Sequence, residues 1–137
     1  MKIYVPDASI ILKWVLGEEK DTDDAFALLN GWLNQEHDFI VPALWRFEVG
    51  NVLGLKRPKE AEAILNLLSA YQFEETTLSA EMVHITFDLM HDHRGVSFYD
   101  ACYHAVAIAI KGTMVTADKT YYSKVKSMGS ILLVGKG

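Results

Sequence analysis

The sequence predicts an α/β fold with a central parallel sheet of four to five strands, and three observations support this. Short apolar segments typical of strands alternate with longer segments that have helical periodicity. Strands separated by helices join through crossover connections, which make neighbouring strands parallel. Half of the 137 residues are hydrophobic, which is enough for a sizeable core, and the length predicts a single domain covering residues 1–137.

The first predicted strand is Ile3–Val5, and the turn at Pro6 and Asp7 ends it. Ser9 is a residue type that caps helices, so a helix is expected over residues 10–16 with Gly17 at its end. Residues 23–34 repeat apolar side chains at close to the helical period, which predicts a second helix. Asp7 therefore follows directly on a strand.

The middle of the chain continues the alternation. Residues 39–41 form a short apolar run, and a helix is expected over residues 43–55. Pro58 suits the first turn of the next helix, which should extend to Tyr71. Residues 73–77 are a weaker strand candidate, and they account for the uncertainty between four strands and five.

The last third repeats the pattern with clearer boundaries. Ser79 begins a helix that ends near residue 91, and Ser97 begins a strongly apolar helix over residues 98–110. Residues 113–116 form a strand, Asp118 begins a short helix, and residues 131–134 form a final strand. In such sheets ligands bind beyond the carboxyl ends of the strands, so functional groups are expected at that edge.

Composition excludes several classes of protein. The chain has one cysteine, Cys102, which excludes a disulfide framework and paired-cysteine zinc sites. No apolar run is long enough to span a membrane, and the first residues do not resemble a signal peptide. We therefore expect a cytoplasmic protein. The net charge of −5 argues against broad nucleic-acid coating but is compatible with a nuclease, because bound cations restore local positive charge.

Three acids fall where the predicted strands deliver side chains to one edge. Asp7 follows the first strand and Asp118 follows the strand at residues 113–116, while Asp100 lies in the first turn of the helix after Ser97. Each also has a purely structural interpretation, because Asp7 and Asp118 could cap helices and Ser97 with Asp100 fits a capping box. Their joint placement favours a functional site.

For Glu48, a purely structural explanation is weaker than for the other three acids. Its helix is apolar nearly all round, and the expected outward stripe is Arg46, Gly50 and Arg57. Glu48 lies about 200° from Arg46 around the helix, so it should point inward together with Asn51. A buried carboxylate needs a partner or a metal. Clustered carboxylates repel one another unless cations bind or protons are taken up, and all-oxygen ligands suit Mg²⁺ or Mn²⁺.

Four segments resemble the PIN-domain family, and more closely its VapC-type toxin branch. The resemblance covers nearly the whole chain in order and spacing, and it departs from the family at Pro6, where an apolar residue is usual. The matching segments are Val5-Pro6-Asp7-Ala8-Ser9, Phe47-Glu48-Val49-Gly50-Asn51-Val52-Leu53, Ser97-Phe98-Tyr99-Asp100-Ala101-Cys102-Tyr103 and Val115-Thr116-Ala117-Asp118-Lys119.

The resemblance implies a PIN-like three-layer sandwich and an Mg²⁺- or Mn²⁺-dependent endoribonuclease. The family's four acids map onto Asp7, Glu48, Asp100 and Asp118, which would act as catalytic residues and metal ligands. Its hydroxyl position maps onto Thr116.

Ser9 and Asn51 are candidates for orienting the acids or contacting phosphate, although a helix cap and a helix-face amide explain them equally well. The implied partners are an RNA substrate, a cognate antitoxin protein that inserts a cationic side chain into the acidic pocket, and a second copy in a homodimer. The alternative is a catalytically silent PIN-like scaffold that binds RNA or protein. A phosphoacceptor receiver domain fits poorly, because such domains need adjacent acids after the first strand and Asp7 lies between Pro6 and Ala8.

Overall fold

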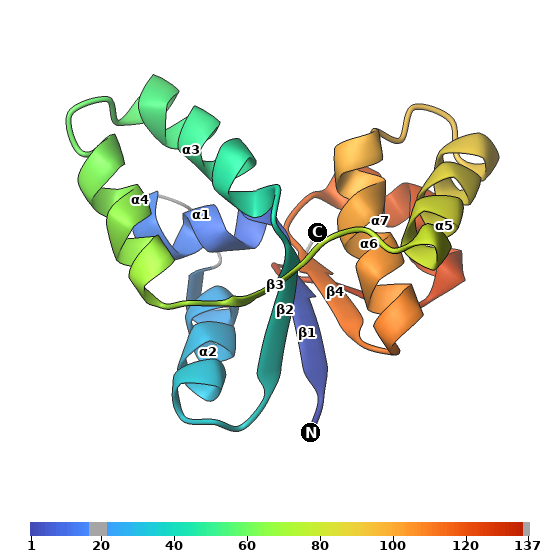
Figure 1. Cartoon of the computed structure of the whole chain (residues 1–137), viewed down its shortest axis with the longest axis horizontal. Coiled ribbons are helices and arrows are strands. Elements are labelled where there is room, and N and C mark those ends of the chain that lie inside the picture. Colours follow the sequence, from blue (N-terminus) through green and yellow to red (C-terminus); the bar gives the residue numbers. More distant parts are fainter. Residues whose placement is uncertain (17–21, 136–137) are drawn as a thin grey trace.

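The computed structural model describes residues 1–16 and 22–135. Its centre is a five-stranded, all-parallel sheet in the order β3-β2-β1-β4-β5. Figure 1 shows α1 to α4 on one side of this sheet and α5 to α7 on the other. The predicted three-layer α/β architecture is therefore confirmed, and the weak candidate at residues 73–77 is the fifth strand.

The elements follow one another along the chain in the predicted alternation. Their bounds are β1 Ile3–Pro6, α1 Ala8–Leu16, α2 Thr22–Leu33, β2 Asp38–Pro42, α3 Trp45–Lys56, α4 Ala61–Ala70, β3 Glu74–Thr76, α5 Ala80–Asp92, α6 Phe98–Ile110, β4 Thr113–Thr116, α7 Lys119–Val125, a 3-10 turn at Lys126–Met128, and β5 Ile131–Leu133. None of the helices in the described part of the chain is long and apolar enough to cross a membrane.

Two local predictions are wrong. Ser9 does not cap α1, because the helix begins at Ala8 and the Asp7 carboxylate accepts from the Ile10 amide instead. Pro58 lies in the turn before α4, and the helix begins at Ala61. Gly17, expected to end the first helix, lies outside the described residues.

The outward stripe expected on α3 is also wrong in part. The most exposed apolar side chains of that helix are Phe47 and Leu55, at 78% and 77%. A Cβ at Gly50 would lie 3.4 Å from the Leu65 side chain, so α4 covers that face of α3. Arg57 donates a hydrogen bond to the Leu16 carbonyl of α1 and does not simply project into solvent.

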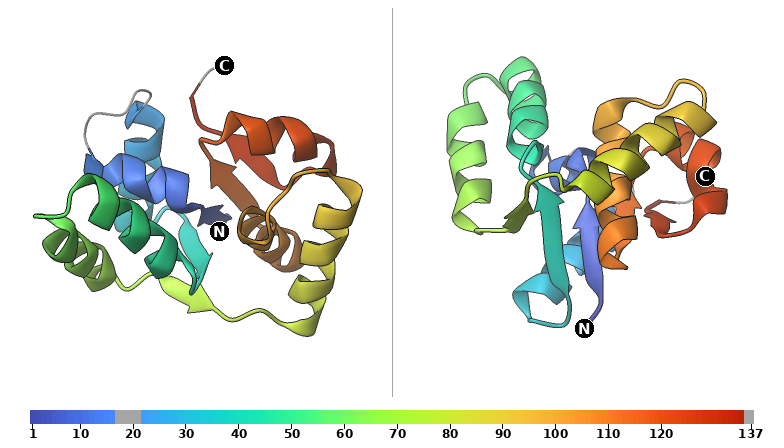
Figure 2. Two further views of the ribbon diagram at one scale, coloured as in Figure 1. Left: turned by 90° about the horizontal axis from the view of Figure 1, so that it is seen from above. Right: turned by 45° about the vertical axis from the view of Figure 1, so that its right-hand side comes forward.

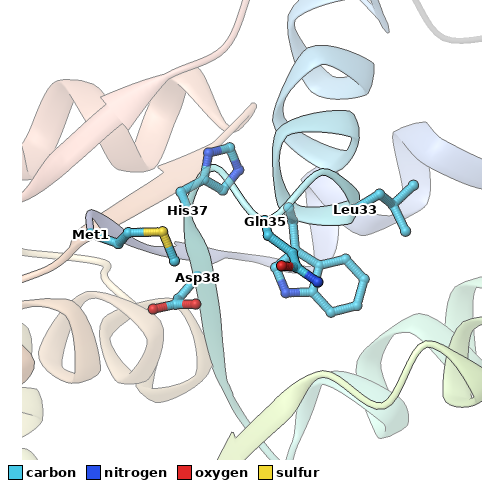
Figure 3. Close-up of a pocket in the computed structure, with 6 residues that line it drawn as sticks. Met1, Leu33, Gln35, His37 and Asp38 are labelled. Atoms are coloured by element: carbon cyan, nitrogen blue, oxygen red, sulfur yellow. The ribbon is translucent and has the colours of Figure 1, made fainter.

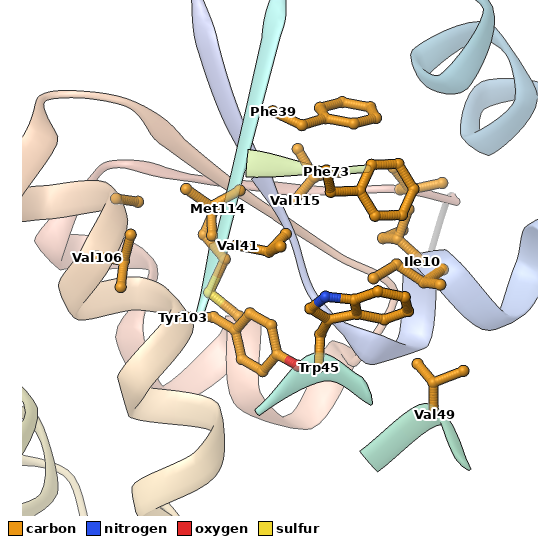
Figure 4. Close-up of a cluster of buried hydrophobic side chains, with 14 of the residues drawn as sticks. Ile10, Phe39, Val41, Trp45, Val49, Phe73, Tyr103, Val106, Met114 and Val115 are labelled. Atoms are coloured by element: carbon orange, nitrogen blue, oxygen red, sulfur yellow. The ribbon is translucent and has the colours of Figure 1, made fainter. Parts of the chain in front are cut away.

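The core fills both faces of the sheet. On the α1–α2 side, stacked rings of Trp14, Phe39 and Trp32 lie against Phe73, with centroid separations of 5.1 to 6.0 Å. On the other side α6 packs against β1, β2 and β4, and its buried Tyr103 is drawn with the central cluster in Figure 4. Burial on both faces explains why β1, β2 and β4 are mostly apolar, whereas the edge strand β3 is polar and largely exposed.

The strand order identifies the edge of the sheet at which a ligand would bind. From β1 the chain adds β2 and β3 on one side, and then β4 and β5 on the other. The order therefore reverses between β1 and β4, and parallel α/β sheets bind ligands beyond the carboxyl ends of the strands at such a point. Asp7 directly follows β1, and Asp118 lies two residues after β4. Figure 2 shows the sheet and the helices that cover it from two further directions.

Candidate active site

Asp7 is the most buried of the four predicted acids, with 4% exposure. Its Oδ1 accepts hydrogen bonds from the Ser9 hydroxyl and, at 3.2 Å, from the Ile10 amide, and its Oδ2 accepts from the Thr116 hydroxyl at 2.6 Å. Burial raises the pKa of Asp7 to about 6, with a further contribution from the charge of Asp100, although its three hydrogen bonds oppose this rise. The position therefore disfavours the charged carboxylate on which metal binding depends.

Two hydroxyl groups join the turn after β1 to the turn after β4. Besides their bonds to Asp7, the Thr116 hydroxyl accepts from the Asp118 amide at 3.0 Å and the Ser9 hydroxyl accepts from the Ala117 amide at 2.9 Å. Thr116 is fully buried. Both residues, predicted as secondary or phosphate contacts, are placed to fix the orientation of Asp7.

Glu48 lies in the first turn of α3 and is half-buried. Its Oε1 accepts a hydrogen bond from the Tyr103 hydroxyl at 2.7 Å. Burial raises the pKa of Glu48, the charge of Asp100 raises it further, and the bond from Tyr103 opposes the rise. Glu48 thus turns toward α6, as its helical phase predicted. Tyr103 was not identified from the sequence, although it lies one helical turn after Asp100.

Asp100 is the acid that links the others. Burial raises its pKa and the charge of Asp118 raises it further, and Asp100 in turn raises the pKa of both Asp7 and Glu48. No cationic side chain among the described residues lowers the pKa of these three acids. Asp118 caps α7, because its Oδ1 accepts from the Tyr121 amide at 3.0 Å.

The acids do not share a single hollow. Glu48 lines a hollow of about 470 Å³ together with Leu44, Phe47, Asn51 and Tyr99. Asn51 lies one helical turn after Glu48, and its side chain is exposed. Asp100 and Asp118 line a smaller hollow of about 50 Å³. Among the described residues, no three acidic, histidine or cysteine side chains lie close enough together to hold a metal ion in this conformation.

The donor chemistry nevertheless fits a divalent cation. All four side chains offer carboxylate oxygens, which are the ligands that Mg²⁺ and Mn²⁺ prefer. Burial is the main cause of the raised pKa values of Asp7, Glu48 and Asp100, and neighbouring carboxylates raise them further. Lys124 lines the same small hollow as Asp100 and Asp118. Carboxylates close to one another repel until a cation or a proton joins them.

Another hollow lies at the opposite edge of the sheet, at the amino ends of β1 and β2. It has a volume of about 430 Å³ and is lined by Met1, Trp32, Leu33, Gln35, His37 and Asp38, most of which are labelled in Figure 3. A single carboxylate lines it, and the His37 ring is hydrogen-bonded to the Leu28 carbonyl at 2.7 Å. This hollow is therefore separate from the acidic site.

Family comparison agrees with the fold. The PIN-domain family model matches residues 4–126, so the chain belongs to the PIN-domain family. The matched region contains all four acids. No curated protein sequence is a significant match to the chain.

Solved structures with the same fold include several toxin–antitoxin proteins. VapBC2 from Rickettsia felis, solved with a promoter DNA fragment, is 16% identical with a TM-score of 0.71, and the match covers 96% of each chain. Mycobacterium tuberculosis VapC20, described as a sarcin–ricin loop cleaving toxin, is 16% identical with a TM-score of 0.67 over 89% of this chain and 94% of that one. VapBC-1 from nontypeable Haemophilus influenzae is 12% identical with a TM-score of 0.67, over 98% and 99%. Likeness at these identities shows a shared fold.

Proposed function

We propose that the chain is a divalent-metal-dependent endoribonuclease and the toxin of a VapBC-type toxin–antitoxin pair. The observation that carries the proposal is geometric: Asp7 and Asp118 follow β1 and β4 at the same edge of the sheet, and Asp100 lines one hollow with Asp118. Asp100 is also coupled electrostatically to Asp7, Glu48 and Asp118. This coupling lies beside the point where strand order reverses, which is where parallel α/β sheets place their ligands. Membership of the PIN-domain family and the fold shared with VapC toxins support the same function.

The residues have distinct roles in this proposal. Asp7, Asp100 and Asp118 would bind Mg²⁺ or Mn²⁺ directly, and Glu48 would bind it directly or through water. A bound divalent cation supplies an acidified water as nucleophile and stabilises charge that develops on the phosphate. Thr116, together with the Ser9 hydroxyl, holds both oxygens of Asp7 in place.

Tyr103 has the corresponding role at Glu48. Its hydroxyl donates to Oε1 of Glu48 and so fixes the orientation of that carboxylate. Asn51 lies one turn further along α3 in the same hollow, where its amide would contact an RNA phosphate or ribose. The RNA would enter from this side, because Thr116 and Asp7 are buried.

The proposed partners follow from the charge of the site. A cognate antitoxin would place an arginine or lysine against the carboxylates, since a guanidinium pairs with carboxylates bidentately. We propose that residues 1–137 act as one domain, in the cytoplasm and as a homodimer. Co-purification with the product of the adjacent gene, followed by a cleavage assay, tests the antitoxin. A complex that cleaves RNA at the rate of the free chain would contradict an inhibitory partner.

Single-stranded RNA cleavage by the purified chain tests the enzymatic proposal. We expect cleavage with Mg²⁺ or Mn²⁺, none with EDTA, and loss of cleavage in Asp100→Asn. Asp92→Asn removes an exposed acid at the end of α5 and should cleave as the wild type does. Full activity in EDTA would refute the metal-dependent mechanism. Absence of cleavage under all conditions would favour the silent scaffold.

A further inference from the structure

A buried hydrogen-bond chain joins the helix that carries Asp100 to the helix that Asp118 caps. His104, fully buried, lies one turn after Asp100 in α6, and its Nδ1 is 2.9 Å from the hydroxyl of Tyr121 in α7. The backbone amide of Tyr121 donates to Oδ1 of Asp118. Tyr121 therefore contacts Asp118 through its backbone and α6 through its side chain.

The contacts of His104 fix its tautomer. Its Nε2 lies 2.8 Å from the Gly129 carbonyl, and a carbonyl oxygen can only accept, so Nε2 carries the proton. Nδ1 is then an acceptor, and the Tyr121 hydroxyl donates to it. The ring is held at both nitrogens, with α7 on one side and the turn before β5 on the other.

We propose that the His104–Tyr121 hydrogen bond is a positioning device that sets the separation of Asp100 and Asp118 and so tunes divalent-metal affinity. The inference rests on the proposed function, because it assigns those two acids as ligands. Asp100 and Asp118 line one hollow together with Tyr121. Their carboxylates repel each other before a cation binds, and the buried bond resists the separation of the helices that hold them.

Substitutions at the imidazole can separate its two contacts. Asn places its side-chain oxygen near the position of Nδ1, so His104→Asn keeps an acceptor for Tyr121 and loses the bond to Gly129. Gln reaches the position of Nε2, so His104→Gln keeps the bond to Gly129 and loses the acceptor. Tyr121→Phe removes the donating hydroxyl and leaves the ring in the core.

Mn²⁺ affinity, measured from the electron paramagnetic resonance signal of free Mn²⁺, tests the proposal without catalysis. We expect roughly 10-fold weaker binding in Tyr121→Phe and His104→Gln, the loss typical of groups that orient metal ligands. His104→Asn should bind within about threefold of the wild type. Thr86→Val is the matched control, because it removes a buried hydroxyl that donates to the Met82 carbonyl within α5, away from the site. It should lower thermal stability and leave Mn²⁺ affinity unchanged.

Each outcome decides between the alternatives. Equal Mn²⁺ affinity in all variants would overturn the positioning role and leave the nuclease proposal intact. Equal losses in His104→Asn and His104→Gln would overturn it as well, because general loosening of the core would then explain them. If Tyr121→Phe fails to fold, the Mn²⁺ affinities of His104→Asn and His104→Gln test the positioning role. Failure of the wild type to bind Mn²⁺ would instead overturn the proposed metal-dependent function, and this inference with it.

Discussion

Replacing Asp7 by Asn should stabilise the fold at neutral pH while abolishing cleavage. The pKa of Asp7 is about 6 against an ordinary value of 3.8. At about 1.4 kcal/mol per pKa unit, keeping this buried carboxylate charged costs about 3 kcal/mol at pH 7.5. Asn is neutral at every pH and avoids that cost.

The amide does not reproduce every contact. Its oxygen keeps the bonds from Ser9 and the Ile10 amide, but its nitrogen faces the Thr116 hydroxyl, which must turn from donor to acceptor. Loss of that donation costs about 1 kcal/mol. A net gain of about 2 kcal/mol remains, which raises the melting temperature by roughly 6 °C in a domain of this size.

The dependence on pH separates this explanation from a general improvement in packing. A folded-state pKa above the unfolded value means that the contribution of protonated Asp7 is complete below pH 3.8 and is lost as the pH rises through about 6. The titration contribution should therefore fall to about a third, about 1 kcal/mol, at pH 4.5. The lost donation from Thr116 offsets this remainder, so the variant and the wild type should then melt at about the same temperature.

Calorimetric melting in EDTA at the two pH values is the appropriate measurement, because a bound metal would stabilise only the wild type. Asp38→Asn removes an exposed acid at the start of β2 and controls for net charge. Asp7→Ala leaves the hydroxyls of Ser9 and Thr116 without their acceptor and should melt below the wild type. If Asp7→Asn melts at or below the wild type at pH 7.5, the burial argument is refuted.

Two further predictions follow from individual contacts. Tyr103→Phe removes the hydroxyl that donates to Glu48. The kcat/KM of RNA cleavage should fall about three- to tenfold, which corresponds to the free energy of one hydrogen bond. An unchanged kcat/KM would show that this bond does not orient Glu48. Gly31→Ala should lower the free energy of unfolding by about 1–3 kcal/mol, because the added Cβ would lie 2.3 Å from the His37 ring. At Gly54 an added Cβ meets nothing within 4 Å, so Gly54→Ala should raise the free energy of unfolding by about 0.5–1 kcal/mol. Denaturant titration measures both glycine variants, and the same sign for both would contradict the packing analysis.

Local chemistry made several elements predictable from the sequence. Ser79, Ser97 and Asp118 each cap a helix at the expected residue, because the capping side chain and the amide it accepts from lie three residues apart. Asp7 and Ser9 compete for the same role at α1, and periodicity could not decide between them. The edge of the sheet at which Asp7 and Asp118 lie was predictable because strand ends are visible as changes in residue pattern.

Contacts between distant segments could not be predicted. Thr116 donates to Asp7 across 109 positions, and Tyr103 donates to Glu48 across 55. The periodicity of the sequence does not predict such long-range hydrogen bonds, because they depend on how the helices and strands pack. The exposure of Phe47 on α3 was missed for a similar reason, since the position of α4 decides which side of α3 is covered.

The position of β1 between β2 and β4 also affects how the protein folds while it is being synthesised. The first strand emerges from the ribosome early but pairs on one side with β4, at residues 113–116. This high contact order delays completion of the central sheet until late in translation. The oxygens that would bind the cation belong to residues 7, 48, 100 and 118, so a nascent chain released before β4 lacks the last of them. If the chain cleaves RNA as proposed, a truncated product of interrupted translation would leave cellular RNA intact.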